Sequence, residues 1–146
     1  MKKFAFSLET VKEYKEQMLE NVKVEYGVIM AAVKQKEDDI AALEREKHDL
    51  NIELNRKNAR GITPLEIAGY QRYLNVLHYN IKQEKRKLEE LNRQAEKKKD
   101  EVIEKRKETA SFDKLKEKRL AEYNQQAMKS QEQFIEEFVV NKSLSK

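Results

Sequence analysis

The sequence predicts an all-α protein in which two long helices form an antiparallel coiled-coil hairpin with a C-terminal helical overhang. Three observations lead to this fold class. Charged residues make up 40% of the 146 residues, with only three Gly and one Pro, a composition typical of long helices and coiled coils. Apolar residues recur at alternating steps of three and four, which is the coiled-coil pattern. Turn signals interrupt that pattern near residue 61.

The first helix is expected from about residue 7 to residue 58. Its apolar seam begins at Leu8 and continues to Leu54. Lys15, Lys36 and Lys47 occupy the seam positions at which the apolar residue is missing. Because the pattern is sustained over several heptads, it favours a coiled coil over a disordered chain of similar composition.

The predicted hairpin turn covers residues 59–63 and rests on four residues that agree with one another. Gly61 suits the left-handed position that follows a helix end. Thr63 is expected to cap the next helix, with Pro64 as its first residue and Glu66 completing a capping box. The sequence therefore changes direction once, at its lone proline.

The second helix is expected from residue 64 to about residue 140, followed by a frayed tail over residues 141–146. A short turn makes the two helices antiparallel neighbours, so residues whose numbers sum to about 123 should lie opposite each other. Leu8 then faces the region of Leu115. Beyond Arg119 the second helix has no partner, and its apolar stripe is expected to become ordered only against another protein. We expect one domain, 1–146, that is monomeric when isolated.

The middle of the hairpin is predicted to be soft. Residues 95–109 offer few large aliphatic side chains to residues 14–26, and each one missing forgoes roughly 1.5–3 kcal/mol of burial. Amide exchange should be faster there than near the turn.

No pattern in the sequence suggests catalysis, a cofactor or a metal site, so no enzyme is expected. The three glycines are isolated, and His48 and His78 have no second histidine at i+4 and no cysteine to join. The net charge of +4 arises from 31 basic and 27 acidic residues. Acids interleave within the basic runs, so nucleic acid is not an expected partner. The absence of cysteine and of a long apolar stretch predicts a soluble cytoplasmic protein.

Three motifs in this order and spacing resemble the flagellar export protein FliJ family over essentially the whole chain. The first is F-x-F-x-L-E at the N-terminus, and the second is Y-Q-x-Y-L after the G-I turn. The third is S-F-D-K-L-K-E-K-R-L-x-E-Y, from Ser111 to Tyr123.

The resemblance implies an antiparallel two-helix stalk, similar to the gamma subunit of rotary ATPases, in the flagellar type III export apparatus. It implies cytoplasmic localisation, peripheral to the cell membrane at the flagellar base. The implied partners are the hexameric export ATPase, a membrane export-gate protein and free export chaperones. Residues implied to contact the ATPase ring are Phe4, Phe6, Leu8, Phe112, Leu115, Arg119 and Tyr123. Those implied for the gate are Leu43, Leu50, Tyr73 and Leu77, although nearby Glu46, Asn80 and Glu84 are more polar than the family pattern.

Three alternatives remain open at this stage. A stalk of a virulence-type secretion system shares the fold, and the F-x-F-x-L-E start favours the flagellar system over it. A generic scaffold that dimerises in parallel is opposed by the turn signals, and sedimentation distinguishes it from a monomeric hairpin. A nucleic-acid-binding coiled coil would lose affinity steeply as salt rises.

Overall fold

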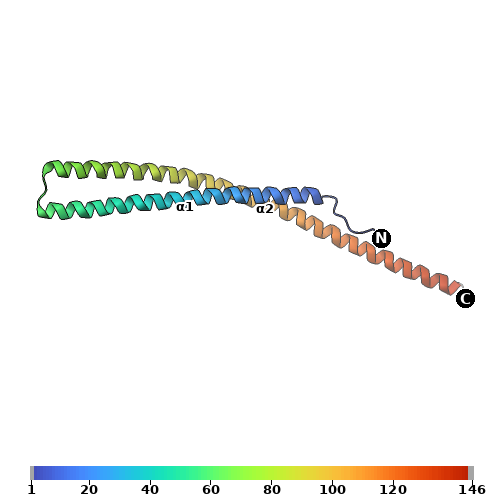
Figure 1. Cartoon of the computed structure of the whole chain (residues 1–146). Coiled ribbons are helices and arrows are strands. Elements are labelled where there is room, and N and C mark those ends of the chain that lie inside the picture. Colours follow the sequence, from blue (N-terminus) through green and yellow to red (C-terminus); the bar gives the residue numbers. More distant parts are fainter. Residues whose placement is uncertain (1, 145–146) are drawn as a thin grey trace. The chain divides into compact units, whose positions relative to one another are not determined.

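The computed structural model describes residues 2–144 and contains two helices, α1 (Glu9–Arg60) and α2 (Pro64–Leu144). No strand occurs among these residues. The two helices pack against each other, so the predicted all-α hairpin is confirmed. Figure 1 shows the turn that joins the end of α1 to the beginning of α2.

The turn consists of residues 61–63, and its geometry follows from the residues that form it. Gly61 has a φ of +91°, a left-handed conformation that residues with a Cβ rarely adopt. Its backbone N–H donates to the Asn58 carbonyl at 3.3 Å. The Thr63 hydroxyl accepts a hydrogen bond from the backbone N–H of Glu66 at 3.2 Å, as an N-cap does. Pro64 then begins α2, where its missing N–H costs no hydrogen bond.

The helix ends differ slightly from those expected. α1 begins at Glu9 rather than near residue 7, because the backbone first forms a turn in which the Glu9 N–H donates to the Phe6 carbonyl at 3.0 Å. α2 continues to Leu144, so residues 141–144 of the expected tail are helical, and residues 145–146 lie outside the described range. Every residue from 128 to 144 is exposed.

The chain divides into two compact units, which are described separately. The terminal unit contains residues 1–21 and 102–146, and the hairpin unit contains residues 22–101. The division falls within the section that the sequence predicts to be soft. Fast amide hydrogen exchange in this section stays a prediction, as does the expectation that the chain forms a single domain.

The hairpin unit buries the seam that the sequence predicts. Its buried apolar side chains are Val22, Val33, Ile40, Leu54, Leu74, Leu77, Ile81 and Ala95. Two lysines each reach a carboxylate on the other helix, the seam residue Lys36 to Glu84 at 2.5 Å and Lys98 to Glu25 at 2.7 Å. The hydrogen bond to Glu84 raises the pKa of Lys36 above its ordinary value, and the one to Glu25 raises the pKa of Lys98. Polar layers of this kind fix the register of a coiled coil.

Neither helix carries a segment that is long and apolar enough to span a bilayer, as far as residues 2–144 are concerned.

Candidate functional site at the paired termini

In the terminal unit, the segment before α1 folds onto α2 through its aromatic side chains. Phe6 is buried, with 7% of its surface exposed, and Phe4 is half-buried. The Arg119 guanidinium lies over the Phe6 ring, with 5.5 Å between its carbon and the ring centroid. Arg119 also donates from Nη1 to the Ser7 hydroxyl at 2.8 Å. One side chain of α2 therefore binds two consecutive residues of the N-terminal segment, through a cation–π contact and a hydrogen bond.

One turn further along α2, Tyr123 makes a second pair of contacts with the same segment. Its ring packs on Phe4 with centroids 5.6 Å apart and an interplanar angle of 54°, a tilted arrangement that aromatic pairs favour. Its hydroxyl donates to the backbone carbonyl of Lys2. We call the set Phe4, Phe6, Ser7, Arg119 and Tyr123 the terminal clasp.

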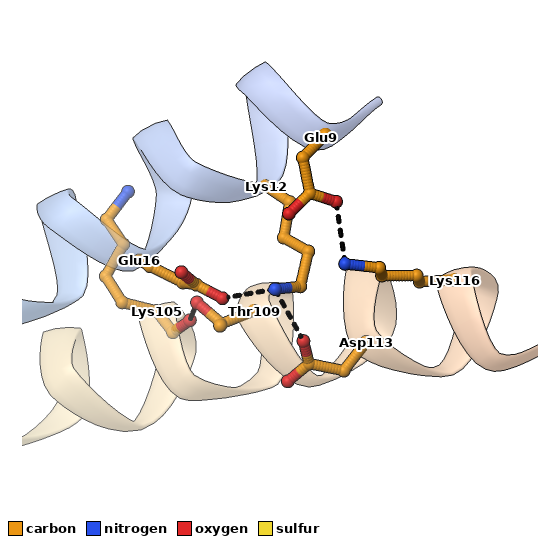
Figure 2. Close-up of polar contacts among 7 residues, drawn as sticks. All are labelled: Glu9, Lys12, Glu16, Lys105, Thr109, Asp113 and Lys116. Atoms are coloured by element: carbon orange, nitrogen blue, oxygen red, sulfur yellow. Dashed lines mark hydrogen bonds and ion pairs between the residues drawn. The ribbon is translucent and has the colours of Figure 1, made fainter. Parts of the chain in front are cut away.

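A charged layer follows the clasp where α1 begins (Figure 2). Lys116 forms an ion pair with Glu9 at 2.9 Å. Lys12 lies between two carboxylates, 2.6 Å from Glu16 and 3.4 Å from Asp113, and only 14% of its side chain is exposed. The hydrogen bond to Glu16 is the main cause that raises the pKa of Lys12, with a smaller contribution from Asp113. The ammonium group therefore remains charged where the helices meet.

The small residues that precede this layer on α2 have satisfied hydroxyl groups. Thr109 is buried, with 8% of its surface exposed, and its hydroxyl donates to the Lys105 carbonyl at 3.0 Å, as Figure 2 shows. Ser111 donates in the same way to Lys107. Such bonds to the preceding turn satisfy the hydroxyl groups within the helix, so these two residues have a structural explanation.

The structure brings together part of the set implied for the ATPase ring. Phe4, Phe6, Arg119 and Tyr123 form the clasp through direct contacts. The other three members, Leu8, Phe112 and Leu115, are half-buried in the same unit.

Other large apolar side chains of the terminal unit are exposed. Tyr14 is 60% exposed, Val11 41% and Leu120 40%. Sequence reasoning missed this exposed group, because it assigned Val11 to the apolar seam and because Tyr14 and Leu120 look like an ordinary helix surface. It also missed Ser7, Lys12, Asp113 and Lys116, although the numbering rule for opposed residues pairs Lys12 with Asp113.

The residues implied for the gate lie in the hairpin unit and are not equivalent to one another. Leu77 belongs to the core, with 3% of its surface exposed, whereas Tyr73 is 45% exposed. Leu43 and Leu50 are half-buried. The Tyr73 hydroxyl donates to the Glu46 carboxylate, and this hydrogen bond raises the pKa of Tyr73. Of the four, Tyr73 presents the largest surface to a partner.

The described residues form a helical hairpin in which aromatic side chains of the segment before α1 pack on α2. Within the range 2–144 no group of three or more His, Cys, Asp or Glu side chains could hold a metal ion. A family model described as "Flagellar FliJ protein" matches residues 4–144. The chain therefore belongs to the FliJ family, whose members are non-catalytic components associated with flagellar export. No curated protein and no solved structure shows a significant match to the chain.

Proposed function

We propose that this chain is the central stalk of the flagellar type III export apparatus. In this proposal its terminal unit binds the hexameric export ATPase and promotes assembly of the ring. Its hairpin unit contacts the export gate at the cell membrane, so that the stalk couples the two, and the stalk also binds free export chaperones. Membership of the FliJ family supports a role in flagellar export, and the terminal clasp is the observation on which the proposed contact with the ATPase ring rests.

The clasp supports this role because it gives a fixed shape to residues 2–7, which lie outside both helices. Two side chains of α2, Arg119 and Tyr123, make four contacts with residues 2–7. Preorganised surfaces lose less entropy on binding. The clasp thus prepares the terminal unit to dock as a preformed body.

The proposed ring contact then combines two kinds of residue. Phe6 and Arg119 act mainly as positioning residues, because Phe6 is buried and Arg119 is engaged by the N-terminal segment. Direct contact falls to exposed side chains of the same unit, above all Tyr14 and Leu120. Tyrosine is enriched among the few residues that supply most of the binding energy at protein interfaces.

The test is to mix the purified chain with the export ATPase and to measure hexamer formation by native mass spectrometry and ATP hydrolysis by phosphate release. Both should rise with the wild-type chain. The double variant Tyr14→Ala with Leu120→Ala should lose most of the stimulation while its helical content is unchanged. A matched control, Ile52→Ala with Val76→Ala, removes equally exposed apolar groups from the hairpin unit and should stimulate normally.

The positioning role is tested separately with Arg119→Ala. Hydrogen exchange in residues 4–9 should become faster and stimulation should fall, because the N-terminal segment is released. If stimulation by both the Arg119 and the Tyr14–Leu120 variants equals wild type, the terminal unit is not the surface that binds the ring.

A further inference from the structure

A groove between α1 and α2 in the hairpin unit has a charge balance unlike its neighbours. Its walls include three lysines, two histidines and one carboxylate, namely Lys47, Lys82, Lys85, His48, His78 and Glu44. The groove has a volume of about 640 Å³. Three lysines against one glutamate leave a formal charge of +2 with both imidazoles neutral. The chain has two histidines in all, and both line this groove.

The pairing of these side chains leaves their positive charge largely uncompensated. Glu44 is engaged by Lys85 at 3.1 Å. Lys47 is a seam lysine, but its ammonium lies 3.4 Å from Nδ1 of His78, whereas the seam lysine Lys36 reaches a carboxylate. Within residues 2–144, Lys82 takes part in no ion pair. Two ammonium groups therefore face the groove without a carboxylate partner.

Two other grooves in the hairpin unit carry the opposite charge. A neighbouring groove between the same helices has two lysines against three carboxylates, namely Lys36 and Lys87 with Asp39, Glu46 and Glu84. A third has one arginine against three carboxylates, namely Arg45 with Glu46, Asp49 and Glu53. Their formal charges are −1 and −2, so an anionic partner would be attracted to the two-histidine groove and repelled by the other two.

We propose that the two-histidine groove is a docking site for an acidic polypeptide segment of a partner protein. This inference does not rest on the proposed ring contact, since the groove lies entirely in the hairpin unit. The α1 wall extends from Glu44 to Asn51, about 10 Å along a helix. An extended peptide covers that length with about three residues, so two carboxylates in an acid–x–acid arrangement fit the groove.

An extended peptide suits the groove better than a nucleic acid does. Its lining includes Ile81, which is 7% exposed and offers an apolar contact to the methylene groups of the two acidic side chains, since residues i and i+2 of an extended peptide point to the same side. The basic surface is short, because its α1 wall covers only residues 44–51. Nucleic-acid sites usually combine many phosphate contacts with stacking aromatic side chains or arginines, and the lining contains no Arg, Phe, Tyr or Trp.

The test uses the full chain and a fluorescein-labelled hexaglutamate peptide, with binding followed by anisotropy at low salt. A hexaglutamine peptide is the control ligand. We expect the double variant Lys47→Gln with Lys82→Gln to bind the glutamate peptide on the order of tenfold more weakly, as expected for two part-exposed charge pairs. The matched control, Lys34→Gln with Lys87→Gln, removes two lysines outside this groove and should change binding less than twofold.

The ring signals of the two histidines give a second readout by NMR. The chain has only these two histidines, so every histidine signal reports on this groove. Both should shift on titration with hexaglutamate and stay unchanged with hexaglutamine. Equal losses in the two double variants would show general charge attraction and overturn the proposal, as would the absence of binding. Stronger Lys47-dependent binding of tripolyphosphate, of a single-stranded oligonucleotide or of anionic vesicles would overturn it in favour of that ligand.

Discussion

Replacing Leu77 by alanine separates a packing role from a contact with the export gate. Leu77 is 3% exposed in the hairpin unit, so the substitution removes three buried carbons. At about 0.8 kcal/mol for each buried CH2 group, the lost burial is about 2.4 kcal/mol, and the cavity left behind raises the cost to about 2.5–4 kcal/mol. We expect that loss in the free energy of unfolding.

The measurement is urea unfolding followed by circular dichroism, where a change in midpoint with constant slope reports a change in stability. Leu65→Ala is the matched control, because Leu65 is a leucine of the same helix that is 82% exposed. It should change stability by less than about 0.5 kcal/mol. If Leu77→Ala behaves like Leu65→Ala, the packing argument is refuted. If Leu77→Ala loses gate binding at unchanged stability, Leu77 contacts the partner directly.

Three further predictions concern the turn, the polar layer and the soft section. Gly61→Ala should destabilise the hairpin by about 1–2 kcal/mol, because alanine must adopt the φ of +91°. Thr63→Ala should destabilise it by about 1 kcal/mol through loss of the helix cap. Thermal melts measure both changes, and a stability equal to wild type would contradict the assigned turn geometry. The hydrogen bond to Lys36 lowers the pKa of Glu84 below its ordinary value of 4.5. The stabilisation that the Glu84 carboxylate contributes is therefore complete above pH 4.5 and is lost as the pH falls through the lowered pKa. Between pH 7 and pH 3, the unfolding midpoint should fall less steeply in Glu84→Gln than in wild type. Hydrogen exchange should be faster in residues 95–109 than in residues 74–81, and equal protection of the two segments would show that the middle of the hairpin is not soft.

The register of the hairpin could be predicted because one turn, marked by the lone proline, determines it. The numbering rule pairs Lys15 with Glu108 and Lys98 with Glu25, and both ion pairs are present. Deviations arise where a long side chain reaches along the helix axis, as Lys85 does to Glu44. The period of the apolar residues therefore predicted the fold class and the buried seam, since both depend on the spacing of those residues.

The clasp could be predicted only in part, for a physical reason. Phe4 and Phe6 precede α1, where no helical period assigns a direction to a side chain. The sequence indicated that the two aromatic segments meet, but it could not show that Phe6 is covered by Arg119. Tyr14, which is 60% exposed, lies beside the seam in α1, and the period does not distinguish such a side chain from an ordinary helix surface.

Alanine scanning of the termini alone would therefore give an ambiguous answer about the ring. A clasp residue such as Tyr123 holds Phe4 and the backbone at Lys2, so its loss would weaken binding even if its side chain never touched the ATPase. Leu120 takes part in none of the clasp contacts, so a loss of binding in its variant reports contact more directly. The loss of binding energy in an alanine variant includes any reorganisation of the free protein. The hydrogen-exchange protection of residues 4–9 must therefore be measured together with binding. Variants that weaken binding without changing that protection then locate the contact surface.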